Sequence, residues 1–188
     1  MKECLILVKH SLPRIEENIP AREWHLSEEG KLRSERLARR LSLYQPHVLL
    51  CSLEPKARET AEIVSRELQL ELHTMENLHE HDRSGSDYLP RQEFQDAIYE
   101  FFLRPDELVF GNETANQAYR RFSKALYTIL EVNGNKTIAV VAHGTVISLF
   151  VSRLTGFSDF QLWKELGLPS FVVVDMEANA ILAKENIL

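Results

Sequence analysis

The chain alternates short apolar runs with longer segments in which apolar residues recur every three or four positions. Such runs are typical of buried strands, and such spacing is typical of amphipathic helices. The predicted strands span residues 4–9, 47–51, 70–74 and 138–142, the predicted helices span residues 28–43, 55–68, 93–103, 114–131, 145–154 and 160–166, and residues 171–175 and 180–184 form a predicted hairpin. Strands that alternate with helices predict an α/β fold: a three-layer αβα sandwich whose largely parallel sheet carries helices on both faces.

Two of these helices have recognisable first residues. Ser27 precedes Glu28 and Glu29, an order typical of an N-cap followed by acidic residues in the positive first turn. Pro55 suits the first turn of the next helix, where a backbone N–H would have no helical partner. These signals place the first two helix starts at residues 28 and 55.

The size and composition of the chain suit one domain. It has 188 residues, of which 44% are hydrophobic and 27% are charged, so we expect a single domain over residues 1–188. No apolar run approaches the roughly 18 residues of a membrane span, and the start of the chain lacks the features of a signal peptide. Cys4 and Cys51 both fall in predicted buried strands, and we expect no disulfide between them. These observations favour a cytoplasmic protein that does not bind membranes.

The charge of the chain argues against a nucleic-acid partner. Its net charge is −6, whereas non-specific binding to nucleic acid needs a concentrated basic surface. The one basic cluster consists of Arg33, Arg36, Arg39 and Arg40, interleaved with leucine and alanine. This pattern is typical of the solvated face of an amphipathic helix.

A histidine directly follows each of two predicted strands. Lys9, His10 and Ser11 follow the first apolar run, and His143 and Gly144 follow the run at 138–142. Ligands of open α/β sheets bind outside the carboxyl ends of the strands. The residues after His143 also begin a helix, whose free amides suit an anion. The two histidines are therefore expected to meet at one site.

Other polar groups are expected at the same edge of the sheet. Ser52 follows the strand at 47–51, and Lys56 lies one helical turn further on. The loop after the third strand contains His79-Glu80-His81-Asp82. Converging cations, an imidazole nucleophile, a carboxylate and free amides suit the transfer of a phosphoryl group.

The motifs, taken in order, resemble those of the histidine phosphatase superfamily, the phosphoglycerate-mutase-like enzymes. That family has Arg-His-Gly after its first strand, where this chain has Lys9-His10-Ser11. The further matches are Ser52-Leu53-Glu54-Pro55-Lys56-Ala57-Arg58-Glu59-Thr60-Ala61, then Leu78-His79-Glu80, Gly111-Asn112-Glu113-Thr114 and Ala142-His143-Gly144. They cover the chain from Leu5 to about Phe150. Each motif is weak alone, and the ordered set is specific.

The resemblance implies a metal-independent phosphatase that needs no cofactor and acts through a phosphohistidine. His10 would be the nucleophile, and Glu80 would protonate the leaving alkoxide and then deprotonate the attacking water. His143 would hold a phosphoryl oxygen, and the predicted phosphate-binding set is completed by Lys9, Ser11, Arg14, Lys56 and Gly144. The role of Glu80 calls for a pKa raised toward neutrality, which burial in the loop would supply. Alternative acids in the same region are Glu76, Asp82 and Asp87.

Three positions depart from the family pattern. Lys9 and Lys56 stand where the family commonly has arginine, whose planar fork grips two phosphate oxygens while lysine acts as a point charge. Arg14 is a candidate to supply the missing fork. Ser11 replaces a glycine, and a left-handed backbone at this residue would cost roughly 1–2 kcal/mol.

Three rival functions remain open. The related mutase would return the phosphoryl group to a second hydroxyl, but the cap-like insertion at about 77–112 is short for enclosing a substrate. A phospholigand-binding module without catalysis is the second rival, supported by Lys9 and Ser11. The third is a metal site formed by residues 79–82, although this loop lacks a helical His-Glu-x-x-His pattern. For the phosphatase, the expected partner is a small phosphorylated substrate.

Overall fold

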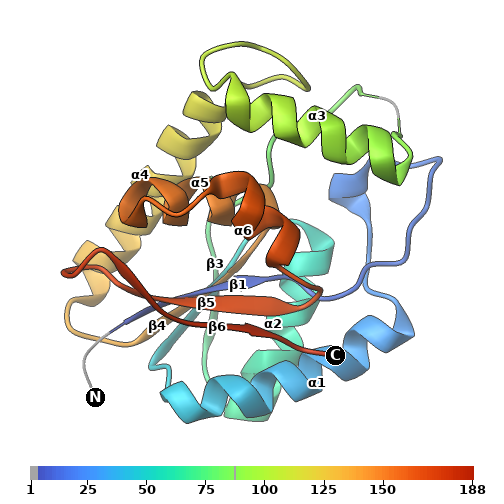
Figure 1. Cartoon of the computed structure of the whole chain (residues 1–188). Coiled ribbons are helices and arrows are strands. Elements are labelled where there is room, and N and C mark those ends of the chain that lie inside the picture. The colour runs from blue at the N-terminus through green and yellow to red at the C-terminus, as the bar shows by residue number, and fades with distance from the viewer. Residues whose placement is uncertain (1–3, 87) are drawn as a thin grey trace.

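The computed structural model describes residues 4–86 and 88–188, and this part of the chain contains a six-stranded sheet (Figure 1). In chain order the strands are β1 (Leu5–Lys9), β2 (Val48–Cys51), β3 (Leu72–Thr74), β4 (Ile138–Ala142), β5 (Ser170–Asp175) and β6 (Ala180–Asn186). They lie side by side in the order β3-β2-β4-β1-β5-β6. The order places β4 and β1 at the centre of the sheet, where both strands have neighbours on each side.

The central strands run in the same direction and end nearly level. β4 is parallel to both β1 and β2, with Lys9 opposite Ala142 and Cys51 opposite Val141. β5 is antiparallel to β1, and β6 is antiparallel to β5. The prediction of a largely parallel sheet with a terminal hairpin is confirmed. The register also brings the residues that follow β1, β2 and β4 to one edge of the sheet.

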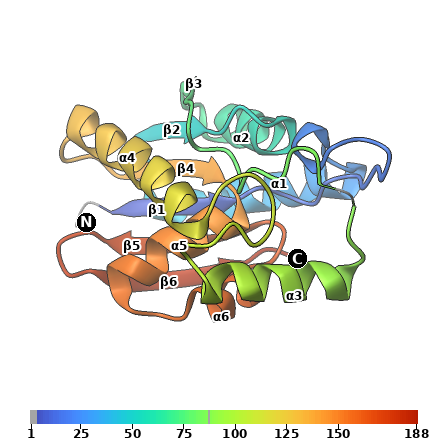
Figure 2. The ribbon, with the colours of Figure 1, turned by 90° about the horizontal axis from the view of Figure 1, so that it is seen from above.

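Helices cover both faces of the sheet, as Figures 1 and 2 show. The helices are α1 (Glu28–Leu41), α2 (Pro55–Leu68), α3 (Arg91–Leu103), α4 (Ala115–Asn133), α5 (Gly144–Thr155) and α6 (Asp159–Glu165), with short 3-10 helices at Ala21–Glu23 and Ser42–Tyr44. α1 and α2 pack together on one face of the sheet, with α1 along the bottom of Figure 1, and α4 and α5 cover the other face, with α6 and α3 above them in the same view. This arrangement confirms the predicted α/β sandwich.

The alternation of side chains along β1 produces the two halves of the core. Leu5 and Leu7 pack on the face covered by α4 and α5, whereas Ile6 and Val8 pack on the face covered by α1 and α2. All four are buried. Each such side chain stabilises the fold by roughly 1.5–3 kcal/mol relative to leaving it exposed. Burial on both faces explains why β1 reads as an uninterrupted apolar run rather than an alternating one.

The predicted helix starts agree with the structure. The Ser27 hydroxyl accepts a hydrogen bond from the Gly30 amide at the start of α1, and Pro55 is the first residue of α2. β3 is shorter than predicted and begins at Leu72. The placement of Cys4 in a buried strand is wrong: it is half-buried and precedes β1, while Cys51 is buried, and both are free thiols.

Within residues 4–86 and 88–188, every helix is too short or too polar to cross a lipid bilayer.

Candidate active site

His10 and His143 lie together at the carboxyl ends of β1 and β4. The amide of His10 donates to the carbonyl of Ala142 at 3.0 Å, which extends the parallel pairing by one residue. The ring centroids of the two histidines are 5.2 Å apart, in an edge-to-face arrangement. His143 is fully buried, while His10 keeps 7% of its surface exposed. The structure therefore brings the two sequence-predicted histidines into one site.

The orientation of the His10 ring leaves one nitrogen available. Its Nδ1 lies 2.7 Å from the carbonyl oxygen of Ser11, and a carbonyl only accepts, so Nδ1 carries the proton and Nε2 has a lone pair. Burial, followed by the charges of His143 and Lys56, holds the pKa of His10 well below its ordinary value. His10 is thus a neutral imidazole at neutral pH, the form that can act as a nucleophile.

His143 is oriented by the residue that follows β2. Its Nε2 lies 2.9 Å from the Ser52 hydroxyl, which also accepts from the Glu54 amide at 3.3 Å. The Ser52 hydroxyl can donate to Nε2 while it accepts from the Glu54 amide, and the Glu54 carboxylate, 3.7 Å from Nδ1, favours the tautomer with the proton on Nδ1. This Nδ1 is buried with no hydrogen-bond partner in the described part of the chain. Burial, together with the nearby charge of Lys56, lowers the pKa of His143 well below its usual value, so it too is neutral.

Two ammonium groups flank the histidines. Lys9 passes over the first residue of α5, where a β-carbon on Gly144 would lie 3.1 Å from its Cε, and its Nζ donates to the carbonyl of Leu166 at 2.7 Å. Burial lowers the pKa of Lys9 to about 8. Lys56 is buried and donates to the carbonyl of Ala21 at 2.6 Å. Glycine at 144 lets the Lys9 side chain reach the helix N-terminus.

Glu80 lies at the same helix N-terminus. Its Oε2 accepts from the Thr145 amide at 3.2 Å, and its Oε1 accepts from the His81 amide at 2.9 Å. The expected direction of its pKa shift is wrong. Burial, the largest influence, raises the pKa of Glu80, but the charges of His143 and Arg83 and the His81 hydrogen bond together bring it below its usual value. Glu80 is therefore ionised at neutral pH.

The structure does not bring Ser11 and Arg14 into this cluster. The Ser11 hydroxyl donates to the carbonyl of Gly30 at 2.7 Å, and its amide donates to Thr60 Oγ1 at 2.9 Å. Its φ is not positive, so serine replaces glycine without left-handed strain. Arg14 is exposed, and its guanidinium binds Glu16 at 2.7 Å. Neither polar side chain is directed at the histidines, so the structure does not gather them with the other residues of the predicted phosphate-binding set.

The histidine-rich loop does not gather metal ligands. His81 is buried against the Phe101 ring, with centroids 4.0 Å apart, and both of its ring nitrogens lack hydrogen-bond partners among the described residues. Asp82 accepts from the amide and the hydroxyl of Ser84. No group of three or more histidine, cysteine or acidic side chains with metal-binding geometry occurs within residues 4–86 and 88–188. Of the alternative acids, Glu76 is exposed, and Asp87 lies outside the described residues.

Two charged residues of the site are absent from the sequence prediction. The Glu54 carboxylate contacts Lys56 at 2.5 Å and lies 3.7 Å from Nδ1 of His143. The Arg83 guanidinium lies 4.7 Å from the centroid of the Phe94 ring, and its charge acts on both Glu80 and His143. Glu54 stands inside the matched motif, before a helix-starting proline, which is the one sequence signal that could have indicated it.

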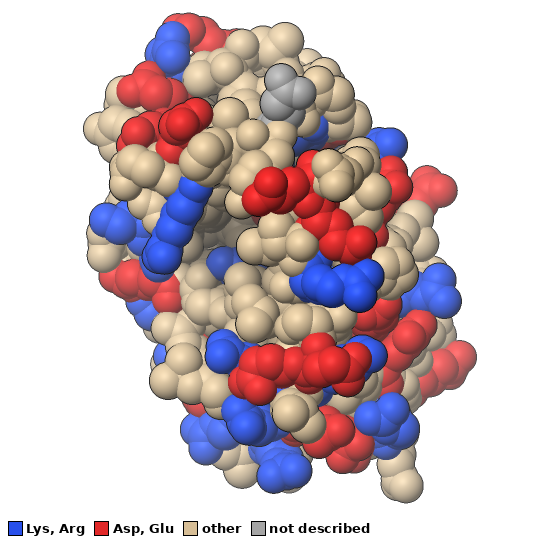
Figure 3. Space-filling model, turned by 90° about the vertical axis from the view of Figure 1, so that its right-hand side faces the viewer, with Lys and Arg blue, Asp and Glu red and all other residues tan. Residues whose placement is uncertain are grey.

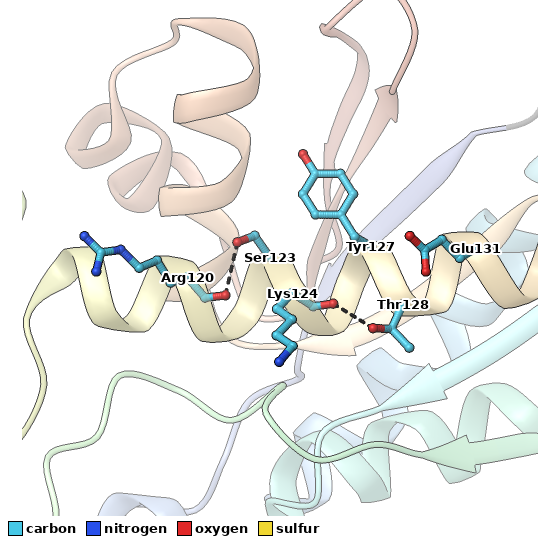
Figure 4. A pocket seen from close by; sticks show the side chains of 6 residues that line it. All are labelled: Arg120, Ser123, Lys124, Tyr127, Thr128 and Glu131. Carbon is cyan, nitrogen blue, oxygen red and sulfur yellow. Dashed lines mark hydrogen bonds between the residues drawn. The ribbon is translucent and has the colours of Figure 1, made fainter.

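A hollow marks this end of the molecule. β1 and β4 point to the right in Figures 1 and 2, and Figure 3 looks onto that side. A hollow opens near the middle of this face, with a basic side chain on its floor and charged side chains of both signs around it (Figure 3). A separate hollow of about 460 Å³ lies along α4 and is shown in Figure 4. Arg120, Ser123, Lys124, Tyr127, Thr128 and Glu131 line it, so it contains none of the residues at the strand ends.

Comparisons with known proteins identify the family of this chain. The model of the histidine phosphatase superfamily (branch 1) matches residues 6–185. An uncharacterized phosphatase, PhoE of Bacillus subtilis (strain 168), is 25% identical over 109 residues, which are 58% of this chain and 53% of that protein. The match therefore spans about half the length of this relative.

Solved structures share the fold at low sequence identity. A phosphoserine phosphatase from Entamoeba histolytica, in complex with 3-phosphoglyceric acid, superposes with a TM-score of 0.78 at 17% identity, covering 98% of this chain and 97% of the other. YhfR of Bacillus stearothermophilus gives a TM-score of 0.77 at 20% identity, with 99% and 98% covered. A mycobacterial glucosyl-3-phosphoglycerate phosphatase gives 0.74 at 17% identity, with 92% and 90% covered.

Proposed function

Because the chain belongs to branch 1 of the histidine phosphatase superfamily, we propose that it is a metal-independent phosphomonoester hydrolase that acts through a phosphohistidine on His10. One observation supports this proposal most directly. A neutral His10, with Nε2 unprotonated, lies beside His143, whose Nδ1 has no hydrogen-bond partner in the described chain. The pair offers a nucleophile and a hydrogen-bond donor to the same small group.

In the first step, Nε2 of His10 attacks phosphorus in line with the leaving oxygen. The N–P bond forms as the P–O bond to the leaving group breaks, and a carboxylic acid proton passes to that oxygen. Glu80 supplies this proton in our proposal. The negative charge of an entering phosphoryl group opposes ionisation of a nearby carboxylate, so substrate binding raises the pKa of Glu80 and lets it take up the proton it donates.

Positive charge and N–H groups stabilise the phosphoryl oxygens during transfer. Lys9 and Lys56 supply ammonium groups, His143 supplies Nδ1–H, and the amide of Gly144 opens α5. Groups fixed in a buried site stabilise developing charge more strongly than water does. In the second step, water attacks phosphorus, the N–P bond to His10 breaks, and Glu80 takes the water proton.

The short segment at 77–112 favours hydrolysis over the mutase reaction. We propose that it is a small cap. Its helix α3 packs on α6 through the ring pairs Phe94–Trp163 and Tyr99–Phe160, whose centroids are 5.8 and 5.0 Å apart. An open site admits water to the phosphohistidine, so release of phosphate competes well with return to a second hydroxyl. The substrate class that fits is a small phosphomonoester.

Hydrolysis of p-nitrophenyl phosphate tests the proposed function. The native protein should release phosphate, and His10→Ala should abolish turnover. His73→Ala is the matched control, since His73 is an exposed histidine on β3 and should leave activity unchanged. Phosphate binding without turnover would favour the phospholigand-binding module. Transfer to an added alcohol without release of phosphate would favour the mutase.

A further inference from the structure

Glu54 is the N-cap residue of α2, yet its side chain accepts no capping hydrogen bond from a backbone amide of that helix. It is directed into the site and is only 11% exposed. The proposed reaction already has a carboxylate in Glu80, so Glu54 is a second acid with no role in the steps above. A buried carboxylate beside phosphate-binding lysines calls for a physical explanation.

The Glu54 carboxylate contacts three residues of the proposed site. Its Oε2 pairs with Nζ of Lys56 at 2.5 Å and lies 3.7 Å from Nδ1 of His143. Its Oε1 accepts from the backbone amide of Glu80 at 2.9 Å. One side chain therefore ties the lysine on α2 to the loop that holds the proposed acid.

These contacts change the charge of the phosphate site. The positive charges of Lys9, Lys56 and Arg83 are partly offset by the carboxylates of Glu54 and Glu80, while both histidines are neutral at neutral pH. Without the Glu54 carboxylate, the net charge of the same cluster would be more positive by one. Charges interact strongly in a buried site because little water screens them, so this difference acts directly on an anionic ligand.

We propose that Glu54 is an internal counter-anion that sets the affinity of the site for phosphate. Its Oε2 occupies on Lys56 the position that a phosphoryl oxygen takes as an acceptor. Phosphate oxygens then compete with Glu54 for this ammonium group and enter a site that already holds a negative charge. The consequence is weak retention of inorganic phosphate, the product of the reaction proposed above, on which this inference rests for its ligand.

Calorimetric titration with inorganic phosphate at pH 7 measures this effect without turnover. Glu54→Gln removes the charge but keeps the shape and one oxygen acceptor for the Glu80 amide. We expect it to bind phosphate at least about tenfold more tightly than the native protein. Glu62→Gln is the matched control: Glu62 is on the same helix, is half exposed and pairs with Arg58. It should change phosphate affinity by less than about twofold, as expected for a surface ion pair.

A second pair of variants tests whether Lys56 carries the effect. In a Lys56→Met background, Glu54→Gln should tighten phosphate binding by less than about threefold, because the competed ammonium group is gone. Glu54→Asp keeps the negative charge, but its side chain is one methylene shorter, so the carboxylate moves away from Lys56. We expect it to increase phosphate affinity by less than Glu54→Gln does. This variant also provides the test if Glu54→Gln does not fold.

Two results would overturn the inference. One is a folded Glu54→Gln protein that binds phosphate no more tightly than the native protein, and the other is an equal gain in the Glu62→Gln control. The proposed function fails separately. If the native protein does not hydrolyse p-nitrophenyl phosphate but Glu54→Gln still raises the phosphate affinity, the proposed reaction is wrong and the role of Glu54 as a counter-anion stands. If hydrolysis needs His10 but Glu54→Gln leaves the phosphate affinity unchanged, the proposed reaction stands and the role of Glu54 as a counter-anion is wrong.

Discussion

The side chain of Lys9 crosses the first turn of α5 so closely that a β-carbon on Gly144 would lie 3.1 Å from its Cε and 3.3 Å from its Nζ. A strand-end cation is thereby held against a helix N-terminus, where both its charge and the helix amides act on the same space. The lysine replaces the arginine expected from the family pattern. Because of this position, the protonation state of Lys9 should affect both phosphate binding and the rate of the reaction.

The pKa of Lys9 predicts an alkaline limit for phosphate binding. Burial lowers this pKa to about 8, so the ammonium group is present at pH 7 and is lost as the pH rises through 8. Inhibition by inorganic phosphate, measured from pH 7 to 9.5, should therefore weaken in the native protein and stay nearly constant in Lys9→Arg, whose guanidinium keeps its proton.

The same residue can be tested by its rate effect at pH 7. Lys9→Ala should lower kcat/KM about 10²-fold, comparable with the loss of one transition-state donor. Lys9→Arg should retain more activity than Lys9→Ala. Equal kinetics for the native protein and both variants would place Lys9 outside the phosphate site.

Glu80→Gln should distinguish a proton donor from a structural carboxylate. Loss of general acid catalysis should lower kcat/KM by about 10²-fold or more for an alkyl phosphate. The loss should be smaller for p-nitrophenyl phosphate, because nitrophenolate leaves without protonation. Glu76→Gln, an exposed acid in the same region, serves as the control and should leave both substrates unaffected. Equal losses of activity on the two substrates would argue against Glu80 as the acid.

His81 should make the fold sensitive to acid. Its ring is 2% exposed, and burial lowers its pKa to about 4, whereas the unfolded chain titrates near 6.5. Below pH 6.5 the unfolded state binds the proton first, so stability falls as the pH drops from 6.5 toward 4. Between pH 7 and pH 5, His81 should account for about 2 kcal/mol of this loss.

Urea unfolding of His81→Leu and of the native protein at both pH values measures the contribution of His81. The variant should lose less stability than the native protein over this interval. His10 and His143 titrate in both proteins, so their contributions cancel in the comparison. His73→Leu, at an exposed position on β3, should behave like the native protein. Identical pH dependence in the His81→Leu and native proteins would contradict this account.

Hydrolysis should survive removal of divalent metal. The charges offered to a phosphoryl group come from Lys9, Lys56 and the start of α5, and His81 is packed against Phe101 instead of facing its neighbours in the loop. Dialysis against EDTA should leave the rate with p-nitrophenyl phosphate within about twofold of the untreated protein, whereas metal-ion catalysis depends on the bound ion. Complete loss, restored by Mn²⁺ or Zn²⁺, would favour a metal site.

The sequence predicted the fold because its periodicities follow from burial. β4 is apolar throughout, since both of its faces are covered, and its predicted bounds match the observed strand. The positions of His10 and His143 follow from the parallel register of β1 and β4, which a strand-helix alternation already implies.

Side-chain direction within the site could not be predicted in the same way. Ser11 and Arg14 follow His10 closely in sequence, but Ser11 bonds to α1 and Arg14 turns to solvent. Glu54 looks like a surface acid at a helix start, and only the packing of α2 beside β4 directs it at Lys56 and His143. These directions depend on contacts between distant segments, and local pattern carries no information about them.

Direct detection of a phosphohistidine on His10 tests the central claim most sharply. The protein is mixed with p-nitrophenyl phosphate, quenched in alkali within milliseconds to preserve the N–P bond, digested, and analysed by mass spectrometry. The account predicts a phosphoryl group on the peptide that contains His10, formed at least as fast as turnover and absent from His10→Ala. Sustained hydrolysis with no phosphorylated peptide, or with the phosphoryl group on another residue, would contradict it.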